Sequence, residues 1–176
     1  MASQETKNIF TIGHSTHSLE DFGEMLRTND IKTLVDVRRY PGSRKFPQFN
    51  KEEFAKSLEK EGFSYIHLED LGGRRKVQKD SKNTRWRNVS FQGYADYMET
   101  EEFRAGMEKL EEIAKKSKTA IMCSEAVWWR CHRSMVSDYL KAKGWKVLHI
   151  LGVHNVQEHP YTSPASVKEG RLSYSE

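Results

Sequence analysis

Residues 8–37, NIFTIGHSTHSLEDFGEMLRTNDIKTLVDV, decide the fold class because two strand-like runs flank a helix-like segment. The first run, Asn8 to Gly13, is rich in β-branched and aromatic residues, as strands are. Ser18 suits the N-cap of a helix, and apolar residues recur at helical spacing from Leu19 to Leu26. Thr33 to Val37 is again strand-like. These residues therefore predict a β-α-β unit.

The same alternation continues along the chain. We expect helices at Lys51–Glu61, Gly93–Thr100, Glu102–Lys116 and Arg133–Lys143, and further strands at Phe63–Leu68, Thr119–Met122 and, as the last strand, Lys146–Ile150. Strands separated by helices predict an α/β fold, with a mostly parallel sheet covered by helices on both faces. A length of 176 residues favours a single domain over 1–176. Ligands of such sheets bind at the carboxyl ends of the strands.

Composition narrows the class of protein. Apolar residues make up 36% of the chain and aromatic residues 11%, which excludes global disorder. There is no run of about 20 apolar residues and no signal peptide, so we expect a soluble, cytoplasmic protein without membrane contact. Cys123 and Cys131 are too few and too far apart for a disulfide scaffold or a CxxC motif, which favours reduced thiols.

Positive charge is concentrated in one segment, at about residues 72–87 (GGRRKVQKDSKNTRWR), which carries seven cations against Asp80 alone. We interpret it as a basic insertion that binds an anionic polymer, with DNA favoured over RNA as the partner. A solvated loop is the alternative. No protein partner is indicated. The nucleic-acid-binding candidates in this segment are Arg74, Arg75, Lys76, Arg85, Trp86 and Arg87.

The densest group of reactive side chains is CSEAVWWRCHR, residues 123–133, between a buried strand and a helix. The helix start, together with Arg130, His132 and Arg133, predicts an anion-binding corner. Glu125 could direct water or stabilise a developing cation there, or it could form a structural ion pair with an arginine. Trp128 and Trp129 could stack on nucleic-acid bases, and at least one of them is expected in the core instead.

Cys123 has two interpretations. Beside a helix start and arginines its thiol pKa could fall, making it a nucleophile. A cysteine at the end of an apolar strand is more often a small core residue. A phosphatase loop is disfavoured, because Trp129 stands where that loop needs an arginine. Metal binding by Cys123, Cys131 and His132 is also disfavoured, so we expect neither a metal nor another cofactor.

The ends of the first two strands add further candidates. His14, in GHS, could position a substrate or a water, although a lone histidine is more often structural. Asp36 could supply a second catalytic carboxylate or could form a buried pair with Arg38. The segment after Asp36 also carries Arg38 and Arg39, which are candidates for binding nucleic acid or another anion, and, around two prolines, Arg44 and Lys45.

Together these motifs resemble the family known as domain of unknown function 488, over about residues 11–154. The resemblance implies a small α/β domain in which the GHS, DVR, CSE and CHR elements gather at one site. It rests on TIGHSTHSLEDF (11–22), LVDVRRYPGSR (34–44), FPQFN (46–50), LEDLGGRR (68–75), GYADYM (93–98) and MCSEAVWWRCHRSMVSDYL (122–140).

Our leading functional hypothesis is an enzyme of DNA repair, a DNA glycosylase that hydrolyses the N-glycosidic bond of a damaged or modified base without a cofactor. Glu125 or Asp36 would stabilise the sugar cation, aromatic side chains would hold the base, and arginines would bind phosphates. The alternatives are a thiol enzyme for a small anionic substrate, with Cys123 as nucleophile, and a nucleic-acid-binding module without chemistry.

Overall fold

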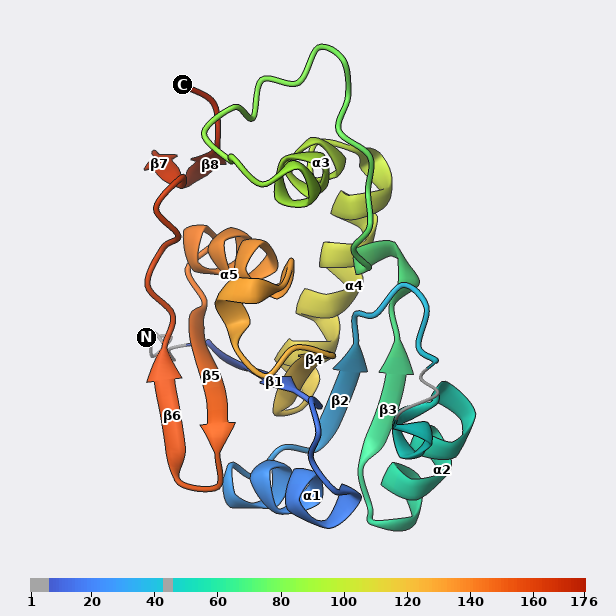
Figure 1. Cartoon of the computed structure of the whole chain (residues 1–176). Coiled ribbons are helices and arrows are strands. Elements are labelled where there is room, and N and C mark those ends of the chain that lie inside the picture. The colour runs from blue at the N-terminus through green and yellow to red at the C-terminus, as the bar shows by residue number, and fades with distance from the viewer. Residues whose placement is uncertain (1–6, 43–45) are drawn as a thin grey trace, which may run out of the picture.

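Six strands build the central sheet of the computed structural model, which describes residues 7–42 and 46–176. The sheet has the order β3-β2-β4-β1-β5-β6, and its first five strands along the chain are parallel (Figure 1). The strands are β1 (Asn8–Gly13), β2 (Thr33–Asp36), β3 (Ser64–His67), β4 (Thr119–Cys123), β5 (Lys146–Gly152) and β6 (Asn155–Glu158). The helices are α1 (Leu19–Thr28), α2 (Lys51–Lys60), α3 (Val89–Tyr97), α4 (Glu101–Lys116) and α5 (Arg133–Ala142).

Helices cover both faces of the sheet. Phe22 of α1 and Phe54 of α2 pack in one apolar cluster, while α3, α4 and α5 contribute to a second cluster that includes Met107. Consecutive residues of β4 point to opposite faces, so Met122 belongs to the first cluster and Ile121 to the second. Burial on both faces explains why the strands are almost continuously apolar, and the α/β fold class predicted from the sequence is confirmed.

The carboxyl ends of three neighbouring strands lie at the same edge of the sheet. Gly13 of β1 pairs with Cys123 of β4, and Asp36 of β2 pairs with Met122 of β4. The backbone N–H of His14 donates to the Cys123 carbonyl at 3.0 Å, so the chain leaves β1 directly beside the end of β4. This register brings segments far apart in the sequence to one place.

The prediction that the last strand ends at Ile150 is wrong. A turn after Gly152 leads into β6, which is antiparallel to β5 and fully exposed. A hairpin of β7 (Ser166–Lys168) and β8 (Arg171–Ser173) follows, and its turn residues Glu169 and Gly170 both have positive φ. These strands are short and polar, so they lack the apolar runs on which the prediction depended.

Element boundaries differ by a few residues elsewhere. α3 begins at Val89 rather than Gly93 because the Asn88 side chain accepts hydrogen bonds from the N–H groups of Ser90 and Phe91. Of the predicted cations after β2, Arg44 and Lys45 lie outside the described residues. No helix in the described part of the chain has the length and apolar character needed to cross a bilayer.

Candidate functional site

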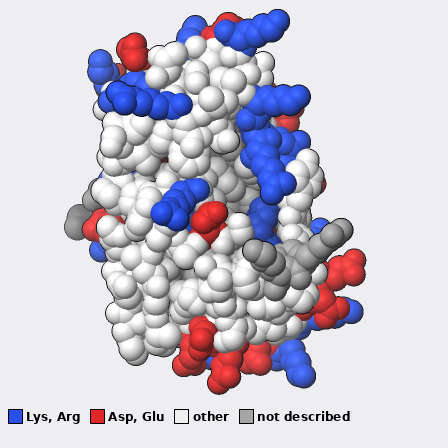
Figure 2. Space-filling model, viewed as in Figure 1, with Lys and Arg blue, Asp and Glu red and all other residues white. Residues whose placement is uncertain are grey.

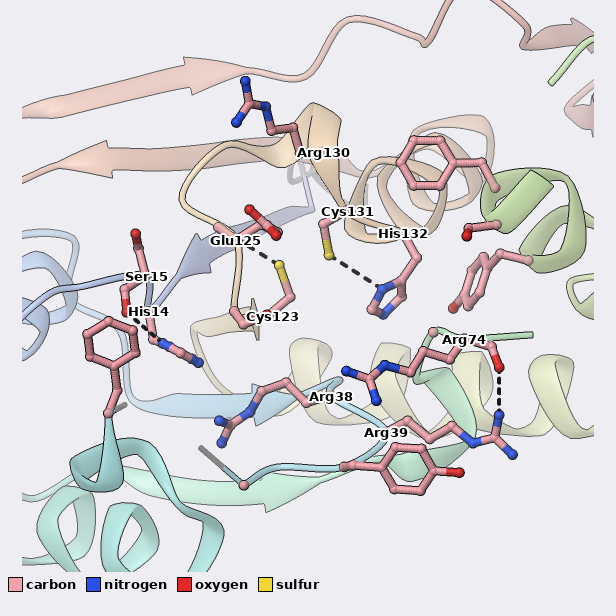
Figure 3. A pocket seen from close by; sticks show the side chains of 18 of the residues that line it. His14, Ser15, Arg38, Arg39, Arg74, Cys123, Glu125, Arg130, Cys131 and His132 are labelled. Atoms are coloured by element: carbon pink, nitrogen blue, oxygen red, sulfur yellow. Dashed lines mark hydrogen bonds between the residues drawn. The ribbon is translucent and has the colours of Figure 1, made fainter. Parts of the chain in front are cut away.

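A cavity of about 540 Å³ lies where β1, β2 and β4 end and α5 begins. Figure 2 shows a hollow in this face of the molecule, with Lys and Arg side chains gathered along one side of it. Its walls come from the loop after each of the three strands, the Gly73–Arg74 loop, the start of α3 and the segment before α5. The lining residues that carry the chemistry are His14, Ser15, Arg38, Arg39, Arg74, Cys123, Glu125, Arg130, Cys131 and His132 (Figure 3).

Three of the four candidate catalytic side chains line this cavity. They are His14 from the end of β1 and Cys123 and Glu125 from the end of β4. The fourth, Asp36, is fully buried and does not line it. The expectation that distant loops meet in one crevice therefore holds for three of these side chains and also for His132.

Asp36 forms the buried ion pair that was the alternative to its catalytic role. Its Oδ1 accepts from Arg38 Nε at 2.9 Å, and its Oδ2 accepts from Arg38 Nη2 at 2.7 Å. Tyr65 also donates its hydroxyl to Oδ2, and Arg38 Nη2 donates to the Phe49 carbonyl. A carboxylate with these partners orients Arg38, which itself lines the cavity. Asp36 is thus a support of the site.

His14 is buried against the ring of Phe49, with the two ring centroids 4.4 Å apart. Its Nδ1 donates to the Ser15 carbonyl at 3.0 Å, which leaves Nε2 unprotonated and turned toward the cavity (Figure 3). Burial lowers its pKa from 6.5 to about 4; the hydrogen bond to Ser15 opposes this shift, and the charge of Arg38 adds to it. At neutral pH His14 is therefore a neutral imidazole that can accept a proton at Nε2.

The two cysteines differ in acidity, and Cys123 has the properties of a buried core residue, the second of its two interpretations from the sequence. Burial raises the pKa of the Cys123 thiol well above its usual value, and the neighbouring Cys131 raises it further. Burial acts on Cys131 in the same direction, but it is outweighed by a hydrogen bond from Cys123, the charge of Arg133 and the Arg133 backbone N–H, which together lower the pKa of Cys131. Cys131 is the thiol that ionises more readily.

His132 lies beside this thiol. Its Nδ1 is 3.4 Å from Cys131 Sγ, and its Nε2 donates to the Val37 carbonyl at 3.1 Å. This second bond leaves Nδ1 as the position that exchanges a proton with sulfur. Gly73 permits the contact, because a Cβ atom on that residue would lie 2.9 Å from Nδ1.

Arg133 does not belong to the cavity wall, contrary to the predicted anion clamp. It is the first residue of α5, is 0% exposed, and points behind the site. Its Nη1 donates to Thr11 Oγ1 at 3.2 Å, and its Nη2 donates to the carbonyl oxygens of Glu125 and Ala126 at 3.0 and 3.4 Å. The Nε atom has no hydrogen-bond partner among the residues that the structure describes. Through these hydrogen bonds, the buried Arg133 side chain fixes the backbone of the Glu125 loop.

Besides Arg38, the described residues that line the cavity include three arginines: Arg39, Arg74 and Arg130. Arg39 Nη1 donates to the Arg74 carbonyl at 2.8 Å, and both guanidinium groups lie within 6 Å of the Tyr40 ring. Arg74 and Ser15, two non-glycine residues that line the cavity, have positive φ, of 61° and 43°. Such backbone strain is concentrated at functional sites.

Most of the basic segment lies away from the cavity. The Arg75 guanidinium lies 3.7 Å from the Tyr97 ring centroid, and Arg85 Nη2 donates to the Ser163 carbonyl. Trp86 packs against the rings of Phe91 and Tyr174. Lys76 and Arg87 are exposed and do not line the cavity. Of this segment's predicted binding residues, Arg74 alone lines it.

The two adjacent tryptophans have different environments. Trp128 is buried and stacks on His149, with ring centroids 4.8 Å apart and an interplanar angle of 8°. Trp129 is 52% exposed and contacts Trp128 edge to face. The expectation that one of the pair belongs to the core is confirmed, and Trp129 is the side chain free to stack on a ligand.

A family model for the domain of unknown function DUF488 matches residues 18–140. The chain belongs to the DUF488 family. The match covers β2, β4 and the Cys123–Arg133 segment, and it does not include His14 or the chain after Leu140. No curated protein and no solved structure matches the chain.

Sequence reasoning did not single out Cys131 as a candidate reactive thiol. A signal was present, since Cys131 lies two residues before the start of α5, and the backbone N–H of Arg133, the first residue of that helix, donates to its Sγ at 3.4 Å. Within the described residues, no three His, Cys, Asp or Glu side chains are grouped so that they could hold a metal ion.

Proposed function

We propose that this DUF488 protein is a thiol-dependent enzyme that acts on a small anionic substrate, with Cys131 as the nucleophile. The observation that carries this proposal is a thiol at the cavity wall, Cys131, whose Sγ accepts from the backbone N–H of Arg133 at 3.4 Å and whose pKa the buried Arg133 charge lowers. Cys131 replaces Cys123 in this role because its pKa is lowered, whereas that of Cys123 is raised.

The charge of Arg133 favours a thiolate. A buried cation is costly unless an anion lies near it. Among the described residues no carboxylate lies within 4 Å of Arg133, and its side-chain partners are a hydroxyl and two carbonyl groups. Its backbone N–H donates to Cys131 Sγ at 3.4 Å. Ionised Cys131 would supply the missing negative charge.

Two histidines support the proton transfers of such a reaction. Cys131 Sγ passes its proton to His132 Nδ1 and attacks an electrophilic centre of the substrate, whose leaving group departs with that proton. Water then attacks the covalent intermediate and gives one proton to His14 Nε2, while Cys131 departs as the thiolate. No oxidant or further reactant is needed.

The charge of the cavity selects the substrate class. Among the described residues, those that line it include Arg38, Arg39, Arg74 and Arg130 and one carboxylate, that of Glu125. Arginine guanidinium groups match the oxygens of phosphate and carboxylate. A substrate with such a group next to its electrophilic centre would be held against Cys131.

Alkylation tests this proposal directly. Tryptic cleavage after Arg130 separates Cys131 from Cys123, so mass spectrometry follows the two thiols independently. We expect iodoacetamide at pH 7 to modify Cys131 much faster than Cys123, and inorganic phosphate to slow the reaction. Arg74→Gln should weaken this protection, whereas Arg104→Gln, on an exposed cation of α4 outside the cavity, should not. Faster alkylation of Cys123, or no reaction of Cys131 below pH 9, would refute the proposal.

Hydrolysis of a glycosidic bond in nucleic acid is the second candidate, because Glu125 is the one acidic side chain among the described residues that line the cavity. Its carboxylate would stabilise the sugar cation and His14 would accept a proton from water. A panel of DNA duplexes, each with one modified base, followed by alkaline cleavage, separates the two candidates. Base release that is lost in Glu125→Gln but kept in Cys131→Ser favours this second function.

A further inference from the structure

A chain of buried hydrogen bonds runs from Arg133 away from the cavity to Asp138 of α5. Arg133 Nη1 contacts Thr11 Oγ1 at 3.2 Å, and Thr11 Oγ1 contacts His149 Nδ1 at 2.5 Å. His149 Nε2 lies 2.8 Å from His159 Nδ1, and His159 Nε2 lies 2.8 Å from Asp138 Oδ1. None of these links is explained by the chemistry proposed above.

With Asp138 ionised and both histidines neutral, the donors and acceptors of this hydrogen-bond chain fall in one consistent order. Arg133 donates and cannot accept, so the Thr11 hydroxyl accepts from it and donates its own proton to His149 Nδ1. His149 then donates from Nε2 to His159, which in turn donates from Nε2 to the Asp138 carboxylate. A buried cation and a buried anion are thereby joined through three neutral links.

All five side chains are enclosed by protein. Each is at most 1% exposed, and Trp128 stacks on His149. Burial, together with the charges of the neighbouring His159 and Arg133, lowers the pKa of His149 to about 2, which keeps this link neutral. The second carboxylate oxygen of Asp138 accepts from the hydroxyls of Thr162 and Tyr174, so the C-terminal segment fixes the far end.

Five buried polar side chains are an expensive way to fill a core, since apolar residues of similar volume are often equally or more stabilising. This cost is explained by what the hydrogen-bond chain contacts at its Arg133 end, beside the cavity. There Arg133 contacts the carbonyl groups of the Glu125 loop, and its backbone N–H contacts Cys131. The network thus ends on the two segments that form the floor and wall of the cavity.

We propose that Thr11, His149, His159 and Asp138 are positioning residues for the cysteine site: they hold Arg133 in the place where its charge stabilises the Cys131 thiolate and its side chain fixes the Glu125 loop. This inference rests on the proposed role of Cys131. It also assigns a purpose to His149, His159 and the C-terminal segment, all of which follow the residues matched by the family model.

Two matched pairs of variants test the inference. Thr11→Val removes the hydroxyl at nearly constant volume, whereas Thr11→Ser keeps it. His159→Leu removes both ring nitrogens, whereas the side-chain amide of His159→Gln can still accept from His149 and donate to Asp138.

The readout is the rate of Cys131 alkylation against pH, measured on the tryptic peptide that begins at Cys131. We expect Thr11→Val and His159→Leu to raise the apparent pKa of this thiol and to slow its alkylation at pH 7 about tenfold, which corresponds to about one pKa unit. Thr11→Ser and His159→Gln should stay within about twofold of the parent chain. Unchanged pH profiles in Thr11→Val and His159→Leu, with lower melting temperatures, would mean a merely structural role and would overturn the proposal.

A second readout does not depend on the thiol. Amide hydrogen exchange in residues 124–128 should become faster in Thr11→Val than in Thr11→Ser, because Arg133 no longer holds the carbonyl groups of this loop. An ordinary thiol pKa in the parent chain would refute the proposed function, and unchanged exchange in Thr11→Val would refute the positioning role. If His159→Leu does not fold, the Thr11 pair alone decides between these outcomes.

Discussion

The carbonyl oxygen of Glu125 lies where a side chain on Gly13 would have to be: a Cβ atom built on Gly13 would be 1.7 Å from this oxygen. The end of β1 and the loop after β4 are therefore in backbone contact. The same oxygen accepts a hydrogen bond from Arg133 Nη2 at 3.0 Å. Gly13 on one side and Arg133 on the other thus define the position of the Glu125 loop, which explains the glycine of the GHS motif by close approach of the backbone.

Gly13→Ala should displace the Glu125 loop and destabilise the protein. Overpacking of a closely packed position costs about 1–3 kcal/mol, and here the obstacle is backbone, which cannot rotate away. We expect a loss of at least this size in the free energy of unfolding measured with urea, together with slower alkylation of Cys131. Gly152→Ala is the matched control, because its Cβ would meet only the Asn155 side chain, at 3.6 Å. Equal stability of the two variants would contradict the close contact.

Removal of the Asp36 carboxylate should be far more damaging than removal of a surface carboxylate. Asp36→Ala leaves the buried Arg38 without its anion, which typically costs about 3–5 kcal/mol. Glu24→Ala breaks the Arg27–Glu24 pair, whose side chains are 42% and 50% exposed, and should cost less than about 1 kcal/mol. Urea unfolding of both variants checks the difference. A loss below about 1 kcal/mol in Asp36→Ala would show that Arg38 finds another partner or solvent.

His14 should make the protein less stable in mild acid. Its pKa is about 6.5 in the unfolded chain and about 4 in the folded one, because burial disfavours the charged ring. Between these values the unfolded chain binds a proton at His14 that the folded chain does not. The free energy of unfolding therefore has its full value above pH 6.5 and decreases as the pH falls to 4, by about 3 kcal/mol in total.

Unfolding free energies of the parent chain and of His14→Asn, measured from pH 4 to 7, isolate this contribution. His149, with a pKa of about 2, also destabilises the folded protein in acid, so the difference between the two chains is the relevant quantity. The free energy of unfolding of the variant should rise less steeply with pH across this range, by the slope that corresponds to about one proton. Parallel curves for the two chains would contradict the buried, neutral state of His14.

The sequence was sufficient to predict the parallel sheet and the meeting of His14, Cys123, Glu125 and His132, because both follow from periodicity and from the geometry of strand ends. The roles of individual side chains at that edge depend on partners distant in the chain. Asp36 was ambiguous until Arg38 and Tyr65 were seen to bind it. Such contacts depend on the tertiary structure, and no local pattern in the sequence predicts them.

Arg133 shows most clearly why charge alone misled the sequence interpretation. An arginine at a helix start was expected to face a ligand, but its first-turn position places its side chain under the Glu125 loop, where carbonyl groups and Thr11 bind it. The histidines behind it were not predicted at all, because His149 lies in an apolar strand and His159 in a polar tail. Only the tertiary structure shows that these two histidines are connected to Arg133.

The adjacent tryptophans offer a final comparison of buried and exposed aromatic side chains. Trp128 is 8% exposed, stacks on His149 and donates its indole N–H to Gln157 Oε1 at 3.3 Å, so Trp128→Ala should cost about 3–5 kcal/mol. Trp129 is 52% exposed, and Trp129→Ala should change stability by no more than about 0.5 kcal/mol. Iodide quenching of tryptophan fluorescence gives an independent measurement: Trp129→Ala should remove much of the quenchable emission, since Trp128 and Trp145 are buried. Equal unfolding free energies of Trp128→Ala and Trp129→Ala would contradict the packing of Trp128 over the histidine chain.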